Sequence, residues 1–95
     1  MDGISVVDSA ERSRFEAVTA DGGLAGFADY LRADDRVVMP HTVVRPDLRG
    51  GGVASALVEA ALDDALERGL PVVPACSFVR AYLERHPERA HQVAG

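Results

Sequence analysis

Three consecutive glycines, Gly50, Gly51 and Gly52, stand directly before a strongly helix-forming segment of this 95-residue chain. The first four N–H groups of a helix have no partner within the helix, and the helix dipole adds about half a positive charge at that end. Glycine lets the oxygen atoms of a ligand approach the backbone closely. No Ser, Thr, Asp or Asn stands immediately before Val53 to accept hydrogen bonds from these donors. The glycines therefore predict a binding site for an anion such as a pyrophosphate.

Two common phosphate-binding motifs fit this loop poorly. A nucleotide P-loop places a Lys-Ser or Lys-Thr pair after its last glycine, whereas this chain has Val53-Ala54 there and contains no lysine. A dinucleotide-binding loop needs a third glycine where Ser55 stands, and it follows a strand of a parallel sheet. The strands that precede this loop are predicted to be antiparallel, so a different phosphate-bearing ligand is expected.

Two further side chains have types and positions suited to chemistry. His41 precedes the end of a predicted strand, and histidine exchanges a proton near neutral pH, so it is a candidate general base. Cys76 stands between a short strand and a helix, where the helix dipole favours the thiolate, and it is a candidate acceptor of an acyl group. The alternatives are a histidine that is hydrogen-bonded for structural reasons and a small buried cysteine.

Hydrophobic periodicity predicts the elements that position these residues. Alternating and β-branched apolar residues predict strands at 4–7, 14–19, 24–31 and 37–44, and Pro40 predicts a break in the last of them. The period then changes, and an apolar stripe from Val53 to Ala65 predicts a helix that ends at Gly69. A short strand is expected at 70–73. A second helix, capped by Ser77, is expected to end near His86 because Pro87 follows.

Composition bounds the class of protein. The length predicts a single domain over residues 1–95, in which residues 89–95 form a frayed tail. The net charge of −5 argues against binding to nucleic acid, which usually needs a basic face. No apolar run is long enough to span a membrane. The N-terminus lacks a signal-peptide pattern, and a single cysteine cannot form an internal disulfide, so a cytoplasmic location is expected.

The segment around the glycines resembles the acetyl-CoA-binding motif of the GCN5-related N-acetyltransferase (GNAT) superfamily. That motif reads Q/R-x-x-G-x-G/A, which Arg49, Gly52 and Ala54 match, and a V-x-P sequence often precedes it, as it does here. The likeness covers about residues 14–88 and is closest to the short single-domain subgroup. Its other parts are His41-Thr42 before the motif, and Pro74-x-Cys76-x-Phe78-Val79-x-x-Tyr82 and His86-Pro87-Glu88 after it.

The resemblance implies an α/β fold with a mixed, mostly antiparallel sheet flanked by helices. Acetyl-CoA is then the cosubstrate, bound where the strands that end at Val44 and Val73 diverge. Tyr82 aligns with the tyrosine that protonates the departing CoA thiolate in many members of the family. Amides expected to bind the pyrophosphate are those of Arg49, Gly50, Gly51, Gly52, Val53 and Ala54, and those expected to bind the pantetheine arm and polarise the thioester are at Val43 and Val44.

The chain departs from larger family members in two ways. Residues 8–13 are too few for the N-terminal helices that wall the acceptor pocket in those proteins, so the fold is expected to be minimal and the acceptor side open or completed by a partner. Ala75 stands where an asparagine often precedes the family's tyrosine. This second departure leaves two mechanisms open, direct transfer assisted by Tyr82 and a covalent acetyl intermediate on Cys76.

The sequence thus predicts an N-acetyltransferase that transfers acetyl from acetyl-CoA to an unidentified amine, either a small molecule or a protein. Cys76, Tyr82 and His41 are the candidate catalytic residues, and no metal site is predicted. Two alternatives are a module that binds or senses acyl-CoA without turnover and an interaction domain that has lost the ligand. The intact Arg49-x-x-Gly52 pattern argues against the latter. Tyr82 is equally compatible with a place in the core, and the oligomeric state is left open.

Overall fold

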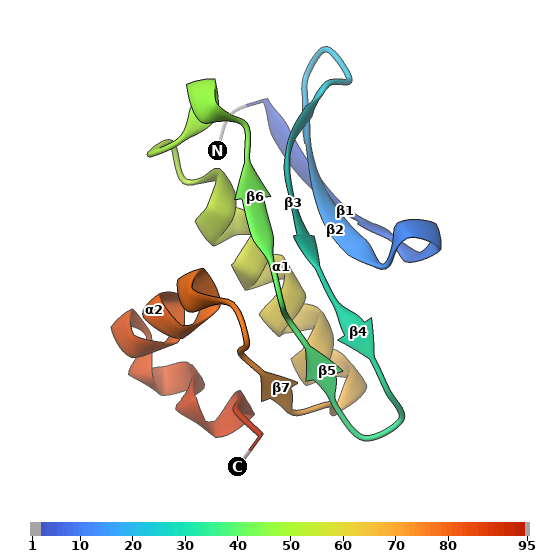
Figure 1. The fold of residues 1–95 in the computed structure, drawn as a ribbon, viewed down its shortest axis with the longest axis vertical. Helices are drawn as coiled ribbons and strands as arrows, with labels where there is room; N and C mark the ends of the chain where they lie inside the picture. Colours follow the sequence, from blue (N-terminus) through green and yellow to red (C-terminus); the bar gives the residue numbers. More distant parts are fainter. Residues whose placement is uncertain (1–2, 95) are drawn as a thin grey trace.

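The computed structural model describes residues 3–94, which form two small sheets and two α-helices (Figure 1). Met1, Asp2 and Gly95, which the single-domain prediction also spans, lie outside the described residues. The first sheet is antiparallel, in the order β1 (Ile4–Ser9), β2 (Arg14–Thr19), β3 (Leu24–Asp29) and β6 (Thr42–Val44). The second contains β4 (Leu31–Arg32), β5 (Val37–Val38) and β7 (Val72–Val73), with β5 and β7 parallel. The predicted mixed, mostly antiparallel α/β fold is confirmed.

The two sheets are joined because two long chain segments each contribute a strand to both. The segment that contains β3 and β4 changes sheets around Tyr30. The segment that contains β5 and β6 changes sheets around Pro40, where the sequence predicted a break. The Asp29 amide donates a hydrogen bond of 2.9 Å to the His41 carbonyl, so the two segments stay paired through the junction. The break thus redirects the strand without detaching it.

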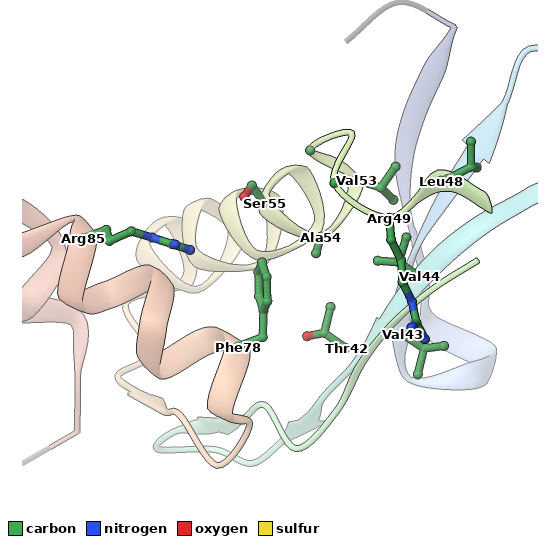
Figure 2. A pocket seen from close by; sticks show the side chains of 12 residues that line it. Thr42, Val43, Val44, Leu48, Arg49, Val53, Ala54, Ser55, Phe78 and Arg85 are labelled. Carbon is green, nitrogen blue, oxygen red and sulfur yellow. The ribbon is translucent and has the colours of Figure 1, made fainter. Parts of the chain in front are cut away.

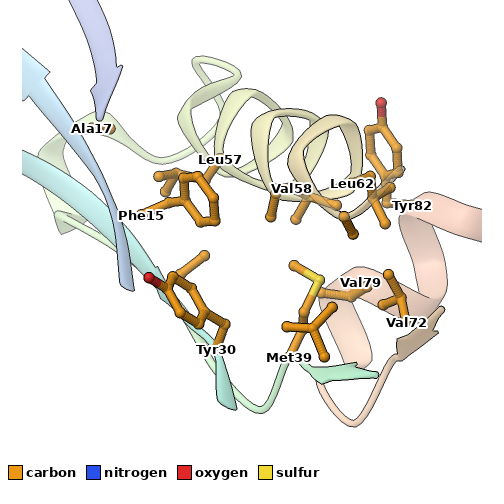
Figure 3. Packing of buried hydrophobic residues seen from close by; sticks show 14 of the residues in the cluster. Phe15, Ala17, Tyr30, Met39, Leu57, Val58, Leu62, Val72, Val79 and Tyr82 are labelled. Carbon is orange, nitrogen blue, oxygen red and sulfur yellow. The ribbon is translucent and has the colours of Figure 1, made fainter. Parts of the chain in front are cut away.

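The long helix α1 (Val53–Arg68) covers one face of the antiparallel sheet and supplies the centre of the core. Its two caps, Gly52 and Gly69, have positive φ values of 89° and 70°, which glycine adopts without a Cβ clash. Its buried side chains follow the predicted stripe: Val53, Leu57, Val58, Ala61, Leu62 and Ala65. Figure 3 shows this stripe facing Phe15 and Tyr30 from the sheet, and Met39, Val72 and Val79 from the other side.

Gly26 brings β3 unusually close to β6. A Cβ atom at Gly26 would lie 2.5 Å from the Val43 carbonyl oxygen and 3.2 Å from the Val44 Cα atom. Gly26 pairs with Val44 across the sheet, and Leu57 of α1 lies over the same spot. Only a residue without a side chain fits between the two strands and the helix, so this glycine sets how near β6 lies to its neighbour.

The second helix, α2 (Ser77–Arg85), begins one residue earlier than the capping prediction implies. Cys76 occupies the N-cap position, and Ser77 is the first helical residue with no capping hydrogen bond from its side chain. The helix ends before His86 and Pro87, as predicted. Neither α1 nor α2 has the length and apolar character that a bilayer span requires in the described part of the chain.

The end of the chain differs from the frayed tail expected over residues 89–95. Residues Pro87–Gln92 form a 3-10 helix, and Gln92 is only 4% exposed. The Gln92 side-chain amide donates a 2.8 Å hydrogen bond to the Leu62 carbonyl, and Arg89 forms a 2.7 Å ion pair with Asp63. The Ala94 amide then bonds to the Val72 carbonyl at 2.8 Å. These polar tertiary contacts hold residues 89–94 against α1 and β7.

The connection between β1 and β2 is short. Only a three-residue 3-10 turn, Ala10–Arg12, and Ser13 separate the two strands. No helix therefore lies between β1 and β2, as the length of that segment predicted. The sheet face opposite α1 exposes several apolar side chains, among them Val7, Leu24 and Val43.

Candidate functional site

The segment that carries β5 and β6 pairs with β7 only as far as Met39. The Met39 amide bonds to the Val73 carbonyl at 3.0 Å, and the Cys76 amide bonds back to the Met39 carbonyl at 2.9 Å. Beyond this pair the chain after Cys76 turns into α2, while β6 continues beside β3 alone. The result is an opening between β6 and α2, at the place predicted from the strands that end at Val44 and Val73.

Backbone register decides which amides of β6 face this opening. The bonds from Asp29 to His41 and from Arg45 to Ala25 show that the odd-numbered residues of β6 bond to β3. Antiparallel pairs alternate, so the amides of Thr42 and Val44 point away from β3, toward the opening. The amide at Val44 therefore faces the opening as predicted. The amide at Val43 is directed toward Phe27 in the sheet, and Thr42 takes its place.

A pocket of about 570 Å³ fills the opening (Figure 2). Three elements build it: β6, the loop that leads into α1, and α2. The residues that line it are Thr42, Val43, Val44, Leu48, Arg49, Gly50, Gly52, Val53, Ala54, Ser55, Phe78 and Arg85. The charged members of this set are two arginines, and no acidic side chain of residues 3–94 lines the pocket. In a chain with a net charge of −5, this lining favours an anionic ligand.

The glycine loop presents free amide groups to the pocket. The first hydrogen bond of α1 runs from the Ala56 amide to the Gly52 carbonyl at 3.0 Å. Among the described residues, no backbone acceptor bonds to the N–H groups of residues 52–55, no side chain caps the helix, and its first turn contains no acidic residue. These donors and the helix dipole converge on the pocket, which is the arrangement that binds phosphate groups.

Not every loop amide is available. The Arg49 amide bonds to the Pro46 carbonyl at 3.4 Å, and the Gly51 amide bonds to the Leu48 carbonyl at 3.3 Å. Gly51 is also the one residue of the predicted loop that does not line the pocket. The free amides of the loop that face the pocket are therefore centred on Gly52 and the first residues of α1.

Cys76 does not line the pocket itself, but its side chain contacts one of the residues that do. Its Sγ atom is 3.7 Å from Oγ1 of Thr42, a pocket-lining residue. Burial by itself raises the pKa of the thiol. Hydrogen bonds from the Val79 amide, the Thr42 hydroxyl and the amides of Phe78 and Thr42 outweigh that effect and hold the pKa below its ordinary value. The site thus stabilises a thiolate, the nucleophilic form of cysteine.

Tyr82 and His41 do not line the pocket. Tyr82 is 3% exposed, and its ring stacks on that of His86 with centroids 4.0 Å apart. Burial and the neighbouring carboxylate of Glu59 raise the pKa of Tyr82. Figure 3 shows its ring beside Leu62, with the hydroxyl directed away from the other labelled side chains. The alternative of a core tyrosine describes this position better than a place beside the thioester.

His41 projects from the face of the sheet opposite α1, because its neighbour Thr42 faces the pocket. Its side chain is 72% exposed, and Nδ1 lies 3.6 Å from a carboxylate oxygen of Asp29. None of the three candidate catalytic residues lines the pocket: Cys76 contacts its lining through Thr42, His41 lies on the outer face of β6, and Tyr82 is in the interior.

Several lining residues carried no prediction as site residues, namely Thr42, Leu48, Ser55, Phe78 and Arg85. A signal for two of them existed. Phe78 and Arg85 are seven residues apart, which is about two helical turns, so both lie on one side of α2. The sequence alone does not show which side of α2 faces the pocket, so neither residue carried a prediction.

Comparison with known proteins identifies the family of the chain. The family model described as GCN5-related N-acetyl-transferase matches residues 14–93, which is most of the chain. The chain belongs to this GNAT family. The streptothricin acetyltransferase of Streptomyces lavendulae is 41% identical to this GNAT chain over 64 residues, which cover 65% of the chain and 34% of that protein. The chain thus spans about a third of the length of this curated relative.

Solved structures show the same fold. A GCN5-like protein from Staphylococcus aureus superimposes with a TM-score of 0.74 at 23% identity, over 100% of this chain and 92% of that one. Nourseothricin acetyltransferase gives a TM-score of 0.57 at 21% identity, over 90% of this chain and 66% of that one. At these identities the likeness establishes the GNAT fold of the chain, and the resemblance predicted from the motif is confirmed.

Proposed function

We propose that this GNAT chain binds acetyl-CoA in the pocket between β6 and α2 and transfers the acetyl group to an amine. The observation that carries the proposal is the lining of the pocket. It combines two arginines, no carboxylate and the free amides at the start of α1 in an otherwise acidic protein. CoA is a polyanion with a long, mainly apolar arm, and both properties match this lining.

In this proposal the ligand lies along the pocket with its pyrophosphate at the glycine loop and its thioester near Thr42. The pyrophosphate accepts hydrogen bonds from the amides of Gly52, Val53 and Ala54, with Arg49 beside it. The pantetheine arm runs along the open edge of β6 and pairs with the amides of Thr42 and Val44, as an added strand does. The thioester then arrives near Thr42, whose side chain contacts Cys76.

Cys76 is the nucleophile that the geometry favours. Its thiolate attacks the carbonyl carbon of acetyl-CoA, the bond from that carbon to the CoA sulfur breaks, and CoA leaves as a thiolate. A neutral amine then attacks the acetyl-cysteine, the amide forms, and the Cys76 thiolate is regenerated as the amine loses a proton. Direct transfer needs an acid for the CoA sulfur, whereas the Tyr82 side chain is buried and stacks on His86.

The acceptor is proposed to approach from the outer face of the antiparallel sheet. No helix lies between β1 and β2 to wall this side, and His41 projects there beside the carboxylate of Asp29. A carboxylate attracts a cationic amine, and the imidazole is then placed to accept its proton. The single unpaired cysteine fits a reducing compartment, so we place the reaction in the cytoplasm.

The alternative proposal is a module that binds acyl-CoA without turnover. The observation in its favour is that none of the three candidate catalytic residues, Cys76, Tyr82 and His41, lines the pocket. Calorimetric titration with acetyl-CoA tests binding, and release of free CoA with a panel of polyamines, small amines and peptide N-termini tests turnover. Binding without any amine-dependent release of CoA identifies the non-catalytic module, and absence of binding refutes both proposals.

A further inference from the structure

Arg85 lies in the pocket without a partner. Seven of the ten basic residues form an ion pair or a side-chain hydrogen bond, and among the described residues three arginines form neither. These three are Arg36, Arg49 and Arg85. Two of them, Arg49 and Arg85, line the pocket between β6 and α2, and Arg36 lies in the turn between β4 and β5.

The two pocket arginines stand at opposite ends of it. Figure 2 shows Arg49 beside Val44 on the side of the glycine loop, whereas Arg85 reaches from α2 toward the first turns of α1, beside Ser55. Phe78 and Ala54 lie between them. Along α2, Arg85 is seven residues from Phe78, which corresponds to about 10 Å. The free amides at the start of α1 and Arg49 suffice for one pyrophosphate, so Arg85 marks a second anionic position.

CoA carries a second, separate anion, the phosphate on the 3′ oxygen of its ribose. We propose that Arg85 binds this 3′-phosphate, with the Ser55 hydroxyl beside it, and that the chain thereby selects CoA over dephospho-CoA. The inference rests on the proposed function, because it assigns part of the same ligand. The planar guanidinium forms paired hydrogen bonds with phosphate oxygens, which a point charge does not reproduce.

A purely structural role for Arg85 makes a different prediction. Arg85 is the basic residue in the last turn of α2, where a cation is favourable to the helix dipole. If that is its whole role, its removal lowers stability slightly and leaves the ratio of CoA to dephospho-CoA affinity unchanged. The ratio of the two affinities therefore separates ligand recognition from helix stabilisation.

The experiment is calorimetric titration of the chain with CoA and with dephospho-CoA at low ionic strength. We expect the native chain to bind CoA about tenfold more tightly, equivalent to about 1.4 kcal/mol. Arg85→Gln is expected to reduce CoA affinity to the level of dephospho-CoA and to leave dephospho-CoA affinity unchanged. Arg85→Lys retains the charge but loses the paired geometry, and is expected to restore part of the preference.

Arg36→Gln is the matched control, since it removes the same charge from an unpaired, exposed arginine away from the pocket. It is expected to keep the full preference for CoA. Equal affinity of the native chain for the two ligands overturns the assignment of Arg85 while leaving the proposed CoA site intact. An equal loss of affinity for both ligands in Arg85→Gln likewise overturns it. Failure of the native chain to bind either ligand refutes the proposed function itself.

Discussion

The Sγ atom of Cys76 and the Oγ1 atom of Thr42 lie 3.7 Å apart, so the N-cap of α2 meets the first residue of β6. This contact adjoins the pocket at Thr42, just beyond the point where β5 and β7 stop pairing. A thiol is thereby placed among backbone amides, beside a pocket-lining residue. The relationship depends on two residues that are distant in the sequence and adjacent only in the fold.

The first prediction concerns the ionisation of Cys76. Because hydrogen bonds hold its pKa below the ordinary value, its thiolate forms at lower pH than that of a free cysteine. The rate of alkylation by iodoacetamide should rise with pH and reach half its maximum below the midpoint of a cysteine peptide. Thr42→Val removes the hydroxyl donor to the sulfur, so its midpoint should move to higher pH. Ser55→Ala, which removes a pocket hydroxyl with no bond to Cys76, should not move it.

The second prediction tests the covalent route. Mixing the protein with acetyl-CoA and no amine should place an acetyl group on Cys76 and release CoA in a burst matching the enzyme present. Mass spectrometry and thiol release measure the two products, and Cys76→Ser should abolish both because a hydroxyl is a far weaker nucleophile at neutral pH. The adduct must form and decay at least as fast as steady-state turnover. An adduct slower than turnover would exclude it as an intermediate.

Elements with local signals were predictable from the sequence. The alternation at residues 14–19 predicted β2 with its observed bounds, and Pro40 predicted a break in its strand because it cannot donate to a ladder. The sequence did not predict that the chain changes sheets at this break. Gly52 and Gly69 bounded α1 because a positive φ suits glycine. The free amides at the start of α1 were predictable from the same loop, because the absence of a capping side chain is visible in the sequence.

Features that depend on tertiary contacts were not predictable in this way. Residues 89–94 show no apolar periodicity, and they are held because Gln92 and Arg89 find partners on α1 that no local pattern indicates. The direction of the Tyr82 ring depends on its stacking against His86 and on the position of α2 beside α1. The place of Arg85 in the pocket depends on the packing of α2 opposite the first turns of α1, which is a tertiary contact.

The third prediction compares the two ends of α1. Gly52 and Gly69 both have a positive φ, so Gly52→Val and Gly69→Val should each strain the backbone and lower stability by about 1–2 kcal/mol. Only Gly52 faces the pocket, where a branched side chain would stand between phosphate oxygens and the amides. Calorimetry should show at least a tenfold loss of acetyl-CoA affinity, about 1.4 kcal/mol, for Gly52→Val alone. An equal loss of acetyl-CoA affinity in Gly69→Val would show that the loss in Gly52→Val results from a less stable helix.

The fourth prediction concerns the packed end of the chain. Gln92→Ala removes the 2.8 Å bond to the Leu62 carbonyl and the 2.9 Å bond from Arg89 in a site that is 4% exposed. Urea denaturation should show a loss of about 1–3 kcal/mol in the free energy of unfolding. The exposed neighbour His91 is the control, and His91→Ala should stay within about 0.5 kcal/mol of the native chain. Equal stability of the two variants would mean that the tail contributes nothing to the fold.

The last prediction concerns the phenol of Tyr82. The side chain is buried, its hydroxyl forms no hydrogen bond with another described residue, and it does not line the pocket. Tyr82→Phe should therefore keep kcat within about twofold and leave the free energy of unfolding nearly unchanged, because the ring and its stacking on His86 are retained. Tyr30→Phe is the matched control. The Tyr30 hydroxyl donates a 2.6 Å bond to Asp8, so its loss should cost about 1 kcal/mol of stability. General acid catalysis contributes about 10²–10⁴-fold, so a fall of that size in kcat with unchanged KM in Tyr82→Phe would make Tyr82 the acid and favour direct transfer.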